Sequence, residues 1–171
     1  MIDLSEEQIN RYAPYCVKRI DCNSFIFTSQ YGVILNVGFA DDYMLLEEGA
    51  YQFFIVNANK KHSPNDPLVK ETVSVIIREF FQQEPAVILY ICDTSDNRQR
   101  IRDRLFTSWF EEYAAKEDYT MLHESVDIDN VIYYGSLLMR KDHPLHEDIS
   151  VMFHDFAVNL PSKLDDLQNG I

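Results

Sequence analysis

An unbroken apolar run at residues 86–92 (AVILYIC) constrains the fold of this chain more than any other stretch. A short run of this kind is typical of a central strand that is covered on both faces. Apolar residues recur at three- and four-residue steps before it, which predicts a helix over residues 66–82, and a second helix is predicted over residues 95–116. The sequence therefore predicts a strand buried between helices, with a right-handed parallel crossover leading into it.

The rest of the chain adds mostly antiparallel elements. The order helix, three strands, helix, strand, helix, hairpin, helix predicts an α+β fold with a mixed, mostly antiparallel sheet and helices on both faces. We expect one domain over residues 1–160 and a loosely ordered C-terminal tail over residues 161–171. The remaining predicted elements are a helix from Ser5 to Pro14, strands at 24–29, 32–39 and 50–58, a hairpin of 119–126 with 131–140, and a helix at 146–157.

The charge of the chain excludes some classes of function. It carries 28 acidic and 15 basic side chains, a formal net charge of -13, which disfavours direct binding to nucleic acid or to an anionic membrane. No signal-peptide pattern occurs, and no apolar run reaches the roughly 20 residues that span a bilayer. The three cysteines lack a C-x-x-C spacing, which indicates reduced thiols. We therefore expect a cytoplasmic protein.

Four of the eight arginines lie within residues 93–104 (DTSDNRQRIRDR). A helical wheel predicts that Ile101, Leu105, Trp109 and Tyr113 form the buried stripe of the helix that follows. Arg98 and Arg102 then lie beside that stripe. Arg100 and Arg104 point to solvent, with Asp96 placed to pair with Arg100.

The candidate anion-binding residues are therefore Arg98 and Arg102, together with Asp93, at a junction where a helix begins. The alternative is that both arginines form structural ion pairs with Asp93 or Asp96. Residues 86–117 contain no glycine, so a glycine-rich phosphate loop cannot be drawn. The imidazoles of His143, His146 and His154 have no metal-ligand spacing, and no metal site is expected. No catalytic residue can be assigned, and Cys92 is expected to be a buried thiol.

The order of elements from 50 to 140 resembles the acetyltransferase fold of the GNAT superfamily. That resemblance implies that acetyl-CoA meets the segment between strand and helix, here NANKKHSPNDP at residues 57–67. The segment lacks the glycines of the superfamily's R/Q-x-x-G-x-G/A loop. Lys60, Lys61 and His62 are the candidate cofactor-binding residues in their place.

A second resemblance is carried by YICDTSDNRQRIRDRLFTSWF at residues 90–110. This stretch is similar to a family of uncharacterised bacterial proteins, a domain of unknown function, which implies no activity and no role for any residue.

We expect a non-catalytic binding or interaction module that needs no cofactor and takes a protein partner or a small anionic ligand, with a homodimer as one form. One alternative is a divergent acyl-CoA-dependent N-acyltransferase. Another is an acidic decoy that binds a nucleic-acid-binding partner.

Overall fold

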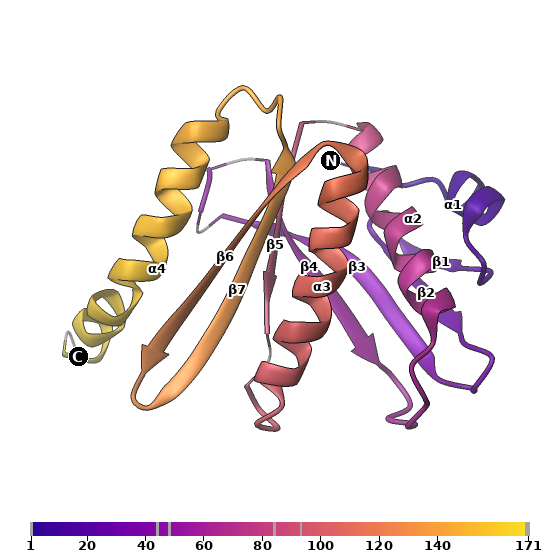
Figure 1. Cartoon of the computed structure of the whole chain (residues 1–171), viewed down its shortest axis with the longest axis horizontal. Helices are drawn as coiled ribbons and strands as arrows, with labels where there is room; N and C mark the ends of the chain where they lie inside the picture. The colour runs from indigo at the N-terminus through magenta and orange to yellow at the C-terminus, as the bar shows by residue number, and fades with distance from the viewer. Residues whose placement is uncertain (1, 44, 48, 84, 93, 170–171) are drawn as a thin grey trace. The chain divides into compact units, whose positions relative to one another are not determined.

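The computed structural model describes the chain except residues 1, 44, 48, 84, 93 and 170–171, and except the side chains of 116–117 and 162–169. Over this part, four helices and seven strands make an α+β protein with a mixed, mostly antiparallel sheet, which confirms the predicted class (Figure 1). The chain forms two compact units: the first holds residues 1–41 and 51–85, and the second holds residues 42–50 and 86–171. No helix in the described part is both long and apolar enough to cross a bilayer.

The first unit contains four strands in the order β1-β2-β3-β4 and two helices. The strands predicted at 24–29 and 32–39 are confirmed and pair with each other, because Phe25 of β2 faces Val37 of β3 in an antiparallel register. Strand β1 was not predicted, since its sequence KRID is exposed along its whole length and gives no apolar alternation. The elements are α1 (Glu6–Tyr12), β1 (Lys18–Asp21), β2 (Ser24–Thr28), β3 (Ile34–Asp42), β4 (Ala50–Asn57) and α2 (Pro67–Gln83).

Aromatic side chains form the core of the first unit. The Phe80 ring on α2 is fully buried and stacks on Phe39 of β3 at 4.2 Å between ring centroids. Tyr51 and Phe81 meet the same ring edge-on at 5.2 and 5.4 Å. Such ring contacts stabilise the fold by more than the burial of each ring's area alone. Phe80 is therefore a central contact of α2 in this core.

The second unit contains the three antiparallel strands β5-β7-β6 and two helices (Figure 1). Helix α4 was predicted to end at 157, but its backbone is helical to Asn169 with Pro161 inside it, and the added length places Leu160 against the strands. The elements are β5 (Val87–Ile91), α3 (Gln99–Glu117), β6 (Tyr119–Ile128), β7 (Val131–Arg140) and α4 (His146–Asn169).

The predicted buried stripe of α3 is wrong. Ile101 is 68% exposed and Leu105 is 41% exposed, while Phe106 and Phe110 are buried. Helix α3 begins at Gln99 rather than at Ser95, and it packs where the Phe106 ring meets Tyr90 of β5 at 4.4 Å. Of the predicted set, Tyr113 is buried and Trp109 is half-buried. The helix therefore has two apolar stripes, and the one with the aromatic partner on the sheet is buried.

Candidate functional site

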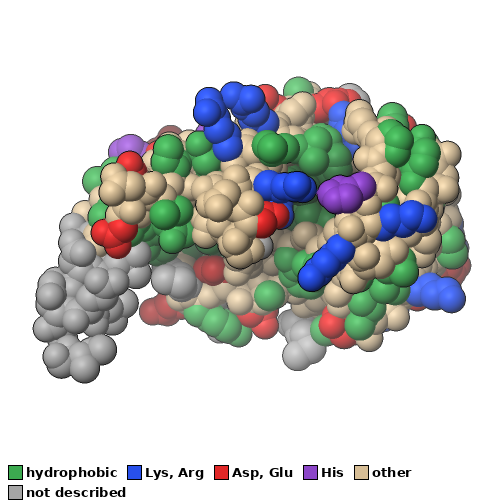
Figure 2. All heavy atoms as spheres, turned by 90° about the horizontal axis from the view of Figure 1, so that it is seen from below, with side chains coloured by type: hydrophobic (Ala, Val, Ile, Leu, Met, Phe, Trp, Pro, Cys, Tyr) green, Lys and Arg blue, Asp and Glu red, His purple; other side chains and the backbone are tan. Residues whose placement is uncertain are grey.

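The four clustered arginines of residues 93–104 lie at the start of α3, and Figure 2 views the molecule from this end, where Lys and Arg side chains reach solvent. Arg98 is the exposed N-cap residue. The guanidinium of Arg102 makes a two-pronged pair with Asp96, at 2.7 Å (Nη1–Oδ1) and 2.5 Å (Nη2–Oδ2). This hydrogen bonding lowers the pKa of Asp96 to about 2.

The prediction that Asp96 pairs with Arg100 at i,i+4 spacing is thus wrong, because Asp96 precedes the helix and pairs with Arg102. For Arg102 the ion-pair alternative holds. Asp93 lies outside the described residues. Anion binding at Arg98 stays a prediction.

Lys60, Lys61 and His62 lie in the first unit and are exposed, in the segment between β4 and α2. The helix start that follows them is capped by the buried carboxylate of Asp66. That carboxylate accepts hydrogen bonds from the Leu68 backbone N–H at 3.1 Å and from the Tyr15 hydroxyl at 2.5 Å. A helix N-terminus attracts anions, and here the chain supplies its own.

A groove of about 80 Å³ lies in the second unit between α4 and the β5-β7-β6 sheet. Alternation along β7 places Leu137 and Met139 on the α4 side, where they join Ile149 and Phe153 in one apolar cluster. The groove continues this cluster toward the hairpin. Its lining includes Leu89, Val126, Tyr133, Gly135, Phe156 and Ala157.

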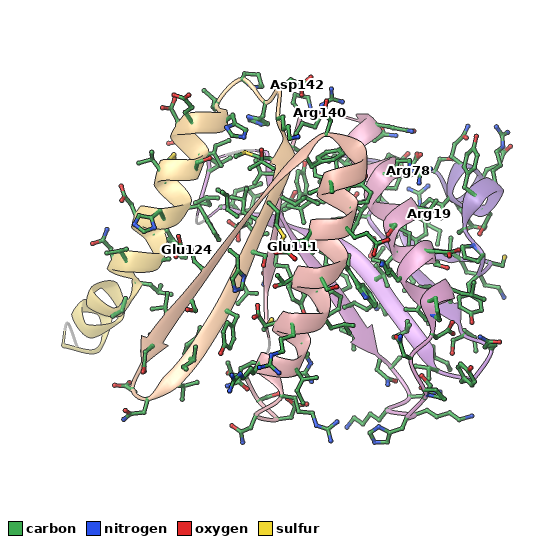
Figure 3. The ribbon with its side chains drawn as sticks, in the orientation of Figure 1. Arg19, Arg78, Glu111, Glu124, Arg140 and Asp142 are labelled. Carbon is green, nitrogen blue, oxygen red and sulfur yellow. The ribbon has the colours of Figure 1, made fainter. Side chains whose placement is uncertain are left out.

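Two carboxylates stand at this groove, from Asp42 and Glu124. Figure 3 shows Glu124 on β6, and its Oε1 lies 2.8 Å from Nδ1 of His154 on α4. This hydrogen bond raises the pKa of His154 above its usual value. Among the described lining residues, none is Lys or Arg. The groove therefore combines an apolar floor with acidic edges.

A polar cluster lies on the α3 side of the same sheet. His123 and Ser136 are cross-strand partners, with Nδ1 and Oγ 3.1 Å apart. The other ring nitrogen of His123 lies 3.5 Å from Asp103 Oδ1 on α3, and burial raises the pKa of Asp103. Ser136 is only 2% exposed, so this line of groups does not present a nucleophile to a substrate. This cluster links α3 to the β6–β7 hairpin.

Another hollow, of about 320 Å³, lies where β7 ends and is lined by charged groups. Arg140 binds Asp142 through two hydrogen bonds of 2.7 and 2.6 Å, and Figure 3 labels both residues. Lys141 pairs with Asp118 at 3.3 Å. Because each of these charges has a partner within the hollow, this surface is balanced in charge.

Cys92 follows β5 and is buried at 2% exposure, as the sequence predicts. Burial, followed by the nearby Asp103 carboxylate, raises the pKa of the Cys92 thiol to about 11. The thiol is therefore protonated at neutral pH, whereas nucleophilic cysteines are thiolates.

We expect a disulfide reagent at pH 8 to modify the exposed Cys16 quickly and Cys92 only after unfolding. The thiolate that the reagent releases on exchange, measured in native buffer and in urea, checks this. Cys16→Ser is expected to remove the fast phase and Cys92→Ala to leave it intact. A fast phase lost in Cys92→Ala contradicts the assignment.

Sequence reasoning missed both the groove and the polar cluster. Each is assembled from β6, β7 and one helix, and Asp103, His123 and Ser136 are single polar residues within otherwise ordinary amphipathic patterns. The available signal was Gly135, the one strand position of β7 without a side chain. A glycine inside a strand often marks a place where something approaches the sheet closely.

Comparison with known proteins gives one family. Searches of curated proteins and of solved structures found no match to this chain. A model described as "Family of unknown function (DUF6169)" matches residues 65–157, which is more than half of the 171 residues and includes the stretch 90–110. The chain therefore belongs to this family of unknown function.

Proposed function

We propose that the protein is a non-catalytic binding module and that its ligand occupies the groove between α4 and the β5-β7-β6 sheet. The observation that carries this proposal is the groove itself, an apolar hollow against the sheet with carboxylates at its edge. A concave apolar surface with a few polar groups is the usual form of a small-molecule site. The burial of Cys92 and Ser136 supports a role without covalent chemistry.

The size and charge of the groove define the ligand. Sites for drug-sized ligands have volumes of about 300–1,000 Å³, and a space of about 80 Å³ suits one compact apolar group. Asp42 and Glu124 favour a ligand whose polar end is cationic over one whose polar end is anionic. The ligand class is therefore a small amine with an aromatic or branched apolar body, or a chain end of that kind.

The acyltransferase alternative has less support. The Asp66 carboxylate occupies the start of α2, the place at which the acetyltransferase resemblance would put the coenzyme A pyrophosphate. A buried carboxylate at 6% exposure repels a pyrophosphate. For the decoy alternative, the net charge of -13 is the sole support.

Benzylamine and benzoate form a matched pair of probes, since they share a ring and differ in charge. We expect benzylamine to shift the amide NMR signals of Gly135 and Ala157 saturably at millimolar concentrations, and benzoate to bind more weakly. Ala157→Leu fills the groove, so that benzylamine can bury less of its apolar body there. Each CH₂-sized part that is no longer buried costs about 0.8 kcal/mol, and we therefore expect binding to weaken about tenfold or more. Two-dimensional spectra over a titration measure all three results.

The control is Val158→Leu, which enlarges the neighbouring side chain of α4 at a position that is 61% exposed. It is expected to bind benzylamine as the natural chain does. Absence of shifts at Gly135 and Ala157, or equal binding by the Ala157→Leu variant, would count against the groove as the site.

A further inference from the structure

The hydrogen bond between His154 and Glu124 joins α4 to β6 at the acidic edge of the groove. Its two atoms, His154 Nδ1 and Glu124 Oε1, are 2.8 Å apart. Among the described residues that line the groove, Glu124 is included and His154 is not. The side chain of His154 is 62% exposed and that of Glu124 is 31% exposed. The carboxylate therefore lies at the groove, and its partner lies outside the groove in contact with solvent.

His154 is the group at this edge whose charge changes near neutral pH. Its hydrogen bond to Glu124, and then the charges of Glu124 and Asp155, raise the pKa of His154 above its usual value. The imidazolium therefore persists to a higher pH than a free imidazole would. The charged groups that face His154 are Glu124 from β6 and Asp155 from α4 itself. No histidine, lysine or arginine occurs among the described lining residues, whose other carboxylate is Asp42.

The proton on His154 changes the charge that a ligand meets in the groove. When the imidazole is neutral, the carboxylate of Glu124 keeps a full negative charge at the groove edge. When the imidazole is protonated, the two groups form an ion pair with no net charge. The attraction between this edge and a cationic ligand is then reduced, whereas an uncharged ligand is not affected.

We propose that Glu124 determines the preference of the groove for a cationic ligand and that His154 is the positioning residue that sets its charge, so that the cation is bound at higher pH and released at lower pH. This proposal rests on the proposed function of the groove and adds its regulation. The coupling is reciprocal. A bound cation competes with the imidazolium for the same carboxylate, and it therefore lowers the pKa of His154 in turn.

Benzylamine and benzyl alcohol test the proposal, because they share a ring and only the amine is cationic. We expect benzylamine to bind about fivefold more tightly at about pH 8 than at about pH 5.5, the effect of one unit charge at a partly exposed site. Benzyl alcohol is expected to bind equally at both pH values. The methyl NMR signals of Val126 and Ala157, two lining residues, measure the binding.

Three variants assign the pH dependence to one pair of residues. His154→Gln keeps a hydrogen-bond donor for Glu124 but cannot take up a proton, and it is expected to bind benzylamine equally at both pH values. Glu124→Gln removes the charge and is expected to bind weakly at both. His146→Gln is the matched control on α4, because the Nε2 atom of His146 lies 2.7 Å from Thr120 Oγ1 and neither residue lines the groove. It is expected to keep the fivefold ratio.

An NMR titration of the His154 ring tests the coupling without relying on affinity. We expect the pKa of His154 to fall in Glu124→Gln, and to fall in the natural chain when benzylamine saturates it. Equal benzylamine affinity at both pH values, or a pH dependence that persists in His154→Gln, overturns this proposal and leaves the groove as a site. Absence of binding at both pH values overturns the proposed function and this proposal together.

Discussion

Phe80→Ala is expected to lower the free energy of unfolding by about 3–5 kcal/mol, the usual cost of deleting a fully buried aromatic ring. Phe80 is 0% exposed and its ring contacts those of Phe39, Tyr51 and Phe81. Removal of the ring loses its burial and leaves a cavity that three other rings, fixed on β3, β4 and α2, cannot fill. Urea unfolding followed by circular dichroism measures the loss.

Tyr12→Ala is the matched control, because it deletes an aromatic ring from the same unit at a position that is 69% exposed. Its free energy of unfolding is expected to stay within about 0.5 kcal/mol of the natural chain. Phe80→Leu is expected to cost less than Phe80→Ala, since it leaves a smaller cavity. Equal stability of Phe80→Ala and Tyr12→Ala would disprove the central role of this ring.

Gly38→Ala is expected to cost about 2–3 kcal/mol, as overpacking of a closed site does. Gly38 on β3 faces Ser24 on β2. A Cβ atom on Gly38 would lie 2.6 Å from Ser24 Cβ, 2.7 Å from the Asn23 carbonyl oxygen and 2.8 Å from Phe54 Cζ. The carbonyl is backbone and accepts a hydrogen bond from Phe39 N–H, so it cannot move aside without loss of that bond.

Gly135→Ala is the control for this position, since it makes the same change on another strand. A Cβ atom on Gly135 would have its nearest contacts at 3.9 and 4.0 Å, which is ordinary van der Waals distance. This variant is expected to gain about 0.5 kcal/mol, because alanine loses less backbone entropy than glycine on folding. Thermal unfolding of the two variants side by side tests the contrast, and equal effects would refute it.

Much of the local structure was predictable because its causes lie within a few residues of chain. The helix predicted over residues 66–82 begins at Pro67, where the Asp66 carboxylate accepts a hydrogen bond from Leu68 N–H. The polar residues at 127–130 between two strand-like segments predicted the β6–β7 hairpin, which is confirmed. The similarity of residues 90–110 to an uncharacterised family is confirmed by the family match.

The candidate site was less predictable, because distant partners decide it. The sequence placed Arg102 beside a buried stripe, but its guanidinium turns to Asp96, outside the helix. The groove requires α4 to continue to Leu160 and requires a bare strand position at Gly135. Gly135 is the single local signal of the groove, and the length of α4 has none.

Helix α3 shows where the two kinds of information divide. By itself the sequence predicted a helix over residues 95–116 with one apolar stripe, because periodicity is a property of the chain, and the helix forms over Gln99–Glu117. Only the tertiary structure decided that Phe106 and Phe110 pack on Tyr90 while Ile101 and Leu105 face outward. The reason is physical: burial free energy depends on the surface that a stripe meets, and that surface is built by a strand elsewhere in the chain.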